Sequence, residues 1–348
     1  MKRIVALLLG VSLTAGLLAG CGSSAGSPTA AGNSANSGSG YEKLDIKIAS
    51  IGTKQGADTV TAQHFADLVN EASGGQIKVT VFSDGSLTGS SMAKMIEMLV
   101  SGGVFDIAIT SGSTLGHIDE RFLTHQIPFL FKDYDEATKY LDGTGGEYYT
   151  KLMAEKGLMP LGSFYNGMRQ LTNSKKEVTG PEDLKNMKIR VPNGEVYMKT
   201  LKDLGADPIA MSWGEVFTAL QQGTIDGEEN GYQTIYSNNI HEVQPYITEW
   251  NWSFDCNFIT VNQAAWNKYS EAAQTLLKEK AEEAAQWGRE QMLNDDKKIK
   301  QEYLDGGKIT ITELTDEQRQ VFVDAVRPVQ EYFIDKFGAE SCAAWGLE

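Results

Sequence analysis

Two arginines are the residues of this sequence best suited to binding chemistry. Arg190 stands at the end of a predicted strand over residues 187–191, and Arg169 lies in a polar stretch upstream of it. A guanidinium offers paired planar donors that match a carboxylate, and it keeps its charge at physiological pH. The chain carries 31 Lys and Arg against 46 Asp and Glu, so an organic anion must be held by locally placed cations. A surface or structural ion pair is the alternative role for either arginine.

A small polar group follows another predicted strand, at residues 105–109. Thr110, Ser111, Gly112 and Ser113 come directly after it. Ligands of parallel α/β sheets bind outside the carboxyl ends of the strands. Ser111 is therefore a candidate ligand contact.

The common catalytic motifs are absent from residue 41 onward. This part of the chain has no G-x-S-x-G, no G-x-x-x-x-G-K-[ST], no G-x-G-x-x-G and no H-E-x-x-H. The four histidines, His64, His117, His125 and His241, show no metal-ligand spacing. A glycosidase-type pair among the 46 acidic residues stays open. We expect no catalytic residue, no metal and no cofactor.

The first 40 residues have the pattern of an export and anchoring segment. Lys2 and Arg3 precede an uncharged apolar stretch typical of a signal peptide over residues 1–20. This stretch ends in L-L-A-G-C, which resembles a bacterial lipobox and predicts lipidation of Cys21. Residues 22–40 are uncharged and rich in Ser, Gly and Ala, as in a flexible linker. We expect an extracytoplasmic protein, at the outer face of the cytoplasmic membrane or in the periplasm, held by its lipid.

Composition excludes several classes of protein. With 348 residues, 41% hydrophobic and 22% charged, the chain suits about two globular domains. The net charge is −15, and it becomes −17 once Lys2 and Arg3 are removed with the leader. No basic stripe with interleaved aromatics is present, so nucleic acid is not an expected partner. Cys256 and Cys342 are expected to be buried free thiols, with a disulfide as the alternative.

Strand and helix patterns alternate along the chain. Leu44, Ile46 and Ile48 alternate with polar residues, and a helical pattern follows before the next alternating stretch. The same order recurs after residue 166, with a strand over 187–191, a helix over 212–222 and a strand over 225–228. The pattern predicts two α/β lobes with mostly parallel strands.

The last third of the sequence predicts one unusually long helix over residues 270–304. At 1.5 Å per residue it would extend about 50 Å and span both lobes. Capping boxes are predicted at Ser212 with Glu215 and at Thr315 with Gln318. A strand is expected over 308–311, and Pro328 is expected to break or kink the final helix.

Six motifs in order carry a resemblance to a known family. They are Y-N-G-M-R-Q-L-T-N (165–173), P-E-D-L-K (181–185), K-I-R-V-P (188–192), L-G-A (204–206), P-I-A-M-S-W-G-E-V (208–216) and A-L-Q-Q-G-T-I-D-G-E-E-N (219–230). This run resembles the substrate-binding proteins of tripartite ATP-independent periplasmic (TRAP) transporters, of the dicarboxylate-binding type. The similarity extends from about residue 44 to the last helix.

The resemblance implies a two-lobed periplasmic-binding-protein-like fold and a carboxylate ligand. It implies strands that cross a hinge, a long helix spanning both lobes, and a cleft that closes on a small organic acid. Arg190 would bind the ligand carboxylate and Arg169 would reinforce it. Asn230 would also reach the ligand, and Trp213 would pack on it. Ser111 and Asn166 complete the predicted set of substrate-binding residues.

The ligand class is narrowed by a departure from the sialate-binding members. Those members carry Glu where this chain has Ser111, and acidic residues where it has Ser90 and Ser91. A sialic acid is therefore not expected. A dicarboxylate, a uronate or another hydroxy or keto acid is favoured.

The predicted organisation is lobe I over residues 44–166 and 256–295, and lobe II over 167–255 and 296–348. The expected function is delivery of an organic acid to the small and large membrane subunits of a TRAP transporter. Two alternatives stay open at this point. One is a ligand-binding sensor lipoprotein, and the other is an exported lipoprotein hydrolase.

Overall fold

The computed structural model describes residues 40–347. The predicted signal peptide, Cys21 and all but the last residue of the predicted linker lie outside the described residues. Between residues 40 and 347, no helix has the combination of length and apolar character that crossing a membrane requires.

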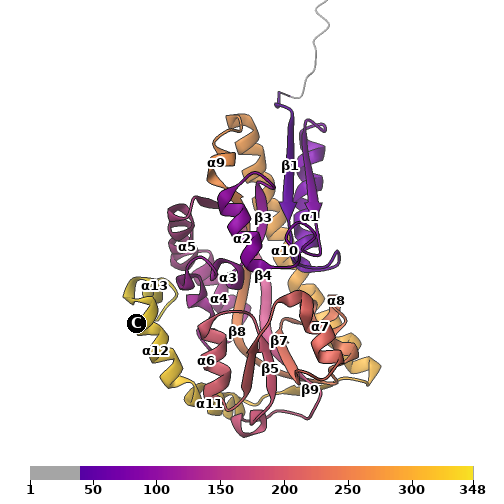
Figure 1. Cartoon of the computed structure of the whole chain (residues 1–348), viewed down its shortest axis with the longest axis vertical. Coiled ribbons are helices and arrows are strands. Elements are labelled where there is room, and N and C mark those ends of the chain that lie inside the picture. The colour runs from indigo at the N-terminus through magenta and orange to yellow at the C-terminus, as the bar shows by residue number, and fades with distance from the viewer. Residues whose placement is uncertain (1–39, 348) are drawn as a thin grey trace, which may run out of the picture. The chain divides into compact units, whose positions relative to one another are not determined.

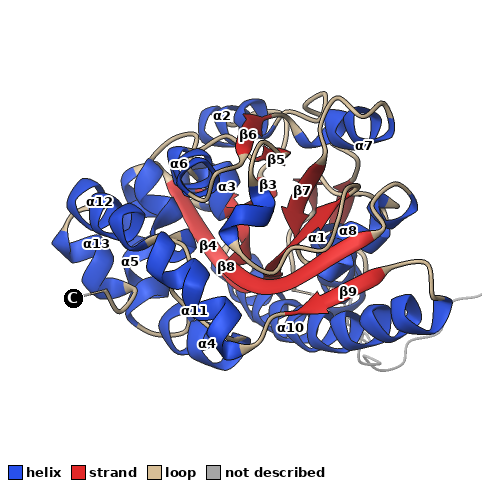
Figure 2. Cartoon of the chain, turned by 90° about the horizontal axis from the view of Figure 1, so that it is seen from below, coloured by secondary structure: helices blue, strands red, loops and turns tan. Residues whose placement is uncertain are grey.

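A nine-stranded mixed sheet runs through the described chain (Figure 2). Its strand order is β2-β1-β3-β8-β4-β7-β5-β6, and β9 pairs with β8. The strands are β1 (Leu44–Ala49), β2 (Ile77–Phe82), β3 (Ile107–Ser111), β4 (Leu158–Asn173), β5 (Lys188–Val191), β6 (Asp207–Ala210), β7 (Gly227–Asn230), β8 (Tyr246–Asn262) and β9 (Thr310–Glu313). The pairs at both ends of the sheet are parallel, as predicted. The centre is antiparallel because β4 and β8 run in opposite directions between the two ends.

Helices cover the sheet (Figure 1). The α-helices are α1 (Ala57–Ala72), α2 (Met92–Ser101), α3 (Gly112–Leu115), α4 (Tyr134–Leu141), α5 (Thr144–Glu155), α6 (Glu195–Asp203), α7 (Trp213–Gln221), α8 (Tyr232–Ser237), α9 (Gln263–Trp266), α10 (Glu271–Gly306), α11 (Asp316–Ala325), α12 (Arg327–Phe337) and α13 (Ala339–Ala344). Three 3₁₀ helices are η1 (Glu120–Gln126), η2 (Pro181–Leu184) and η3 (Ile240–Glu242).

The first end of the sheet follows the apolar alternation of its sequence. Ile46 and Ile48 of β1 are buried and pair in register with Val79 and Val81 of β2. Phe65 and other apolar residues of α1 pack against them in one core cluster. A separate cluster forms where β5 and α6 meet α11 and α12. The two ends of the sheet therefore have their own cores.

Two long strands connect these ends. β4 and β8 pair along most of their length, and Figure 2 shows them as long curved neighbours in the sheet. Their pairing register shifts between Tyr165 and Gly167. Gly167 has φ +122°, and a Cβ there would lie 3.2 Å from the Gly231 Cα, so this position favours glycine. β4 and β8 are thus the strands that join the two ends of the sheet.

Helix α10 has 36 residues and closely matches the predicted long helix. The Ser270 side chain caps its start by accepting from the Ala273 N–H at 3.3 Å. The helix contacts α1 and β4 along part of its length and α8 and β9 along another part (Figure 1). It therefore touches elements from both predicted lobes.

Local predictions have mixed outcomes. The capping box of α11 is confirmed, since Thr315 Oγ1 accepts from the Gln318 N–H and Gln318 Oε1 accepts from the Thr315 N–H. The capping box at Ser212 is wrong. The Glu215 N–H donates to the backbone carbonyl of Ser212 at 3.1 Å, and the serine side chain makes no cap hydrogen bond.

The end of the chain and the cysteines agree with expectation. The predicted final helix is interrupted between α11 and α12, and Pro328 lies in the first turn of α12. The last strand is Thr310–Glu313, two residues later than predicted. Cys256 and Cys342 are both free and buried, so the disulfide alternative is wrong.

Candidate functional site

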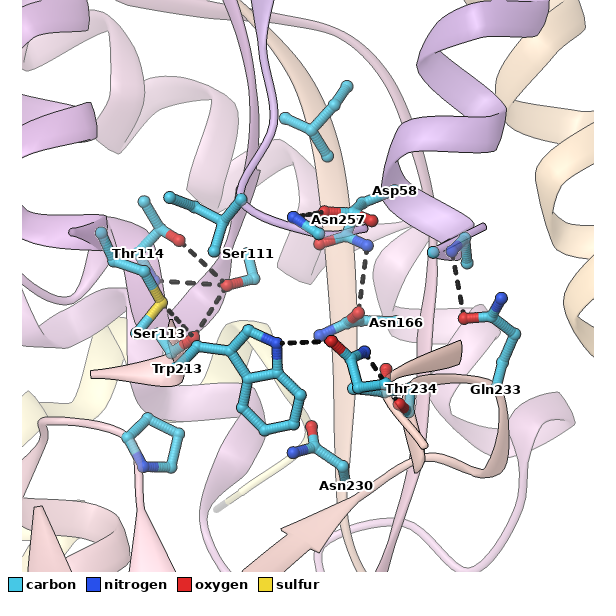
Figure 3. A pocket seen from close by; sticks show the side chains of 18 of the residues that line it. Asp58, Ser111, Ser113, Thr114, Asn166, Trp213, Asn230, Gln233, Thr234 and Asn257 are labelled. Carbon is cyan, nitrogen blue, oxygen red and sulfur yellow. Dashed lines mark hydrogen bonds between the residues drawn. The ribbon is translucent and has the colours of Figure 1, made fainter. Parts of the chain in front are cut away.

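One cavity is lined by side chains from both ends of the sheet (Figure 3). All six predicted substrate-binding residues lie on it: Ser111, Asn166, Arg169, Arg190, Trp213 and Asn230. They come from β3, β4, β5, α7 and β7. The sequence motifs, which are spread over 120 positions from Ser111 to Asn230, thus meet at one place.

Arg190 is buried without an acidic partner. Its side chain lies on β5 and the residue is 1% exposed. Nε and Nη2 donate to the carbonyl oxygen of Met211 at 3.0 and 2.7 Å. No carboxylate in the part of the chain that the structure describes forms an ion pair with it. Burial lowers the pKa of Arg190 to about 10, although the charges of Glu228 and Glu229 oppose this shift.

Trp213 covers the Arg190 guanidinium. The Arg190 Cζ lies 5.2 Å from the centroid of the indole ring, a cation–π distance. Trp213 is the first residue of α7, and its Nε1 donates to Asn238 Oδ1 at 3.2 Å, drawn as a dashed line in Figure 3. The ring is therefore positioned by two contacts, one with Arg190 and one with Asn238.

Arg169 is neutralised by protein carboxylates. Its Nε and Nη2 donate to the two carboxylate oxygens of Glu229, and Nη2 also donates to the Glu229 backbone carbonyl. Its Nη1 lies 3.5 Å from Asp255 Oδ2. Burial alone would lower the pKa of Arg169, but the charge and hydrogen bonds of Glu229, together with the charge of Asp255, hold the pKa above its ordinary value. Arg169 lines the cavity, yet most of its hydrogen-bonding capacity is used within the protein.

Buried carboxylates orient the two predicted asparagines. Asn230 Nδ2 donates to Glu228 Oε2 at 2.6 Å, and burial raises the pKa of Glu228 to about 7. Asn166 Nδ2 donates to Asp255 Oδ2 at 2.7 Å. Burial would raise the pKa of Asp255, but hydrogen bonding with His125 and the charge of Arg169 lower it. Asp255 is therefore an ionised acceptor.

Ser111 belongs to a cluster of hydroxyls. It ends β3 and caps α3, where its Oγ accepts from the Thr114 N–H at 3.3 Å. The Oγ atoms of Ser111 and Ser113 lie 2.8 Å apart (Figure 3). The cluster faces the cavity at the carboxyl end of β3, where the sheet topology predicts ligand contacts.

Sequence reasoning missed several side chains of the cavity, among them Asp58 and Asn257. Asp58 lies in the first turn of α1, after the loop that follows β1. Ser111 was predicted because ligands bind at the carboxyl ends of strands, and the same argument applied to β1 would have indicated this loop. Asn257 lies on β8 and donates to Asn166 Oδ1 at 3.2 Å (Figure 3). No sequence motif marks Asn257, because its role depends on the pairing of β8 with β3 and β4.

The cavity combines a buried guanidinium with polar side chains. Within residues 40–347, no group of three or more His, Cys, Asp or Glu residues is arranged to hold a metal ion. The cavity has one guanidinium that no acidic side chain of the described residues pairs with, an aromatic ring over it, and several hydroxyl and amide groups. This set can hold an organic anion.

Comparisons with known proteins agree with this geometry. The model of the family "Bacterial extracellular solute-binding protein, family 7" matches residues 50–336. The C4-dicarboxylate-binding protein DctB of Bacillus subtilis is 30% identical over 299 residues, which are 86% of this chain and 85% of that protein. The 2,3-diketo-L-gulonate-binding periplasmic protein YiaO of Escherichia coli is 32% identical over 277 residues, which are 79% of this chain and 82% of that protein.

A solved structure is similar over the same region. The sugar acid binding protein DctPAm from Advenella mimigardefordensis, in complex with galactonate, has a TM-score of 0.83 and 27% identity. The match covers 88% of this chain and 97% of that chain. These comparisons confirm the predicted α/β fold and the family resemblance. The chain belongs to family 7 of the bacterial extracellular solute-binding proteins, the substrate-binding proteins of TRAP transporters.

Proposed function

We propose that this protein binds a small organic acid by pairing the ligand carboxylate with Arg190, and that it delivers the acid to the small and large membrane subunits of a TRAP transporter. The observation that carries the proposal is the pairing state of the two arginines in the cavity. Arg169 is held by Glu229, whereas Arg190 has no acidic partner among the described residues. A buried cation without a counter-ion is costly, and a ligand carboxylate would supply the missing charge.

The geometry around Arg190 favours a carboxylate. Its Nε and Nη2 are fixed by the Met211 carbonyl, and no described acceptor engages Nη1. Guanidinium and carboxylate form short charge-assisted hydrogen bonds. Trp213 would contact the same end of the ligand. Asn230 lies on β7, the strand that pairs with the Arg190 strand β5, and it lines the same cavity.

Binding is proposed to close two lobes on the ligand. Lobe I would comprise residues 44–166 and 256–295, and lobe II residues 167–255 and 296–348. The boundaries fall within β4, β8 and α10, the three elements that run through both proposed lobes. The ligand would contact Arg190, Trp213 and Asn230 from lobe II and Ser111 and Asn166 from lobe I. It would favour closure by its higher affinity for the closed form.

Residues 1–40 are proposed to export and anchor the protein. Residues 1–20 would be removed as a signal peptide, Cys21 would carry the lipid, and residues 22–40 would act as the linker. The protein would act outside the cytoplasm at a membrane surface, binding its ligand without turnover. Mass spectrometry of the mature protein from its native membrane tests the anchor. A mature chain that retains Lys2 or lacks a lipid on Cys21 would contradict it.

A thermal-shift screen tests the binding proposal. The purified protein, unfolded and refolded to remove bound ligand, is screened against dicarboxylates, uronates, aldonates, keto acids, sialic acid and neutral sugars. A ligand at 100 times its Kd adds about 2.7 kcal/mol to the free energy of unfolding. Stabilisation by carboxylates alone is the expected result. Stabilisation by neutral sugars alone would overturn the proposal. A bound acid recovered intact after incubation would support binding without turnover, and its conversion would contradict it.

A further inference from the structure

The cavity is asymmetric in charge. The charged residues that line it in the described chain are Asp58, Arg169 and Arg190, and Arg169 is paired with Glu229. Arg190 lies on β5, whereas Asp58 follows β1. In the sheet order β3, β8, β4 and β7 separate these two strands. The cavity therefore has an unpaired cation on one side and a carboxylate on the other.

The side remote from Arg190 presents a fixed amide oxygen. The Asp255 carboxylate can only accept hydrogen bonds, so the Asn166 amide turns its Nδ2 toward it, at 2.7 Å. Asn166 Oδ1 then accepts from Asn257 Nδ2, at 3.2 Å. Asn257 Oδ1 then accepts no hydrogen bond from any group between residues 40 and 347. Asn257 and Asp58 both line the cavity (Figure 3).

The Asp58 carboxyl group is held rigidly at the same side. Its Oδ2 accepts from Ser50 Oγ and the Gly52 N–H, both at 2.8 Å, and Oδ1 accepts from the Thr59 N–H at 2.8 Å. These bonds favour the ionised form, although burial raises the pKa of Asp58 overall. A ligand group beside Asp58 and Asn257 Oδ1 must donate hydrogen bonds. A second carboxylate has no hydrogen-bond donors to offer these oxygen atoms.

We propose that the ligand is a hydroxylated monocarboxylate of the aldonate or uronate class, whose carboxylate pairs with Arg190 and whose hydroxyl groups donate to Asn257 Oδ1 and Asp58. This inference rests on the proposed function, because it takes the Arg190 contact as given. Ser111 and Ser113 can either donate or accept, so they fit hydroxyl groups as well. A ligand without hydroxyl groups would leave the Asn257 oxygen desolvated and unpaired, which costs affinity.

Two matched sets of acids test the inference by isothermal titration calorimetry. The four-carbon set is threonate, succinate and butyrate, and the six-carbon set is gluconate, adipate and hexanoate. Each set compares a hydroxylated monocarboxylate, a dicarboxylate and a plain monocarboxylate of one chain length. In at least one set, the hydroxylated acid is expected to bind at least tenfold more tightly than the other two. A dicarboxylate that binds as tightly as the hydroxylated acid in both sets would overturn the inference.

Two variants locate the effect on the residues named. Asn257→Ala is expected to weaken binding of the preferred hydroxylated acid at least tenfold, whereas the exposed Asn267→Ala leaves it unchanged. Asp58→Asn keeps the shape of the side chain. It is expected to reduce the ratio of the affinity for the hydroxylated acid to the affinity for the dicarboxylate. Melting temperatures without ligand show whether each variant is folded. An unchanged preference in both folded variants would overturn the assignment.

The outcome also separates this inference from the function on which it rests. If a dicarboxylate is preferred and its binding is lost in Arg190→Ala, the proposed function stands and the inference fails. If binding of every acid is unaffected by Arg190→Ala, or if none of the six acids and no uronate binds, the proposed function fails for ligands of this size and the inference fails with it.

Discussion

The guanidinium of Arg190 lies over the indole of Trp213, with 5.2 Å between Cζ and the ring centroid. This contact stabilises the buried cation without neutralising it, because an aromatic face attracts positive charge and carries no net charge itself. The Met211 carbonyl, which accepts from Nε and Nη2, is neutral as well. Arg190 therefore remains available to an anion, in contrast to Arg169, which is paired with Glu229.

Replacing Arg190 with Ala should weaken ligand binding by about 2–5 kcal/mol, because the ligand carboxylate would be desolvated and unpaired. Titration calorimetry with any acid that binds the unmodified protein measures this loss. Arg327→Ala is a suitable control, since the Arg327 side chain is 64% exposed and pairs only with Asp324 among the described residues. An affinity for Arg190→Ala within threefold of the original would contradict the assignment.

Substitutions of Trp213 should separate its ring from its hydrogen bond. Trp213→Leu removes the aromatic face over Arg190 and should weaken binding by about 1–2 kcal/mol. Trp213→Phe keeps a ring and loses only the Nε1–H donor to Asn238, so it should lose less. The affinities of the two variants for one acid give the comparison. If leucine and phenylalanine behave alike, the contact with Arg190 contributes nothing to binding.

Much of the fold was predictable from local patterns. The alternation of Ile46 and Ile48 predicts β1, and the uninterrupted stretch over 270–304 predicts α10. Both elements can be predicted because the residues that become buried are apolar and repeat with the period of a strand or a helix. The capping box at Ser212 failed because the backbone carbonyl could take the Glu215 N–H instead. A capping-box motif shows which hydrogen bonds can form at the start of a helix. It does not determine which of them forms.

The candidate site was predictable where motifs were present and where the carboxyl end of a predicted strand marked it, as at Ser111. Arg190 and Trp213 lie in motif stretches and line the cavity. The pairing of Arg169 with Glu229 depends on the antiparallel register of β4 and β7, which places Leu171 opposite Glu229. Asn257 comes from a strand without a motif. Contacts of this kind join segments that are distant in sequence, so no local pattern encodes them.

Glu228 should make stability depend on pH. Burial raises its pKa from 4.5 to about 7 in the folded protein, so the folded state keeps a proton that the unfolded chain has released. Stability from this group is complete below about pH 4.5 and is lost as pH rises through 7. The loss is on the order of 3 kcal/mol. Urea unfolding at several pH values should therefore show Glu228→Gln gaining stability over the unmodified protein between pH 5 and pH 8.

An exposed carboxylate provides the control for this experiment. Glu282 lies on the exposed surface of α10, and Glu282→Gln should show no such gain across the same pH range. A stability difference between Glu228→Gln and the unmodified protein that is constant from pH 5 to pH 8 would show that Glu228 does not titrate in this window.

Of the two arginines of the cavity, Arg169 should contribute more to the stability of the fold and Arg190 more to ligand binding. Arg169→Gln leaves Glu229 buried without its cation, and breaking a buried pair in this way costs about 3–5 kcal/mol. Arg190→Gln removes a buried charge that has no acidic partner in the described chain. The loss of unfolding free energy in this variant should therefore be less than half of that in Arg169→Gln. Urea unfolding at pH 7 without ligand compares the two variants. The double variant Arg169→Gln/Glu229→Gln should regain part of the loss, because neither buried group is then charged. If Arg190→Gln is destabilised as strongly as Arg169→Gln, then Arg190 is a structural residue and the anion site must be sought elsewhere in the cavity.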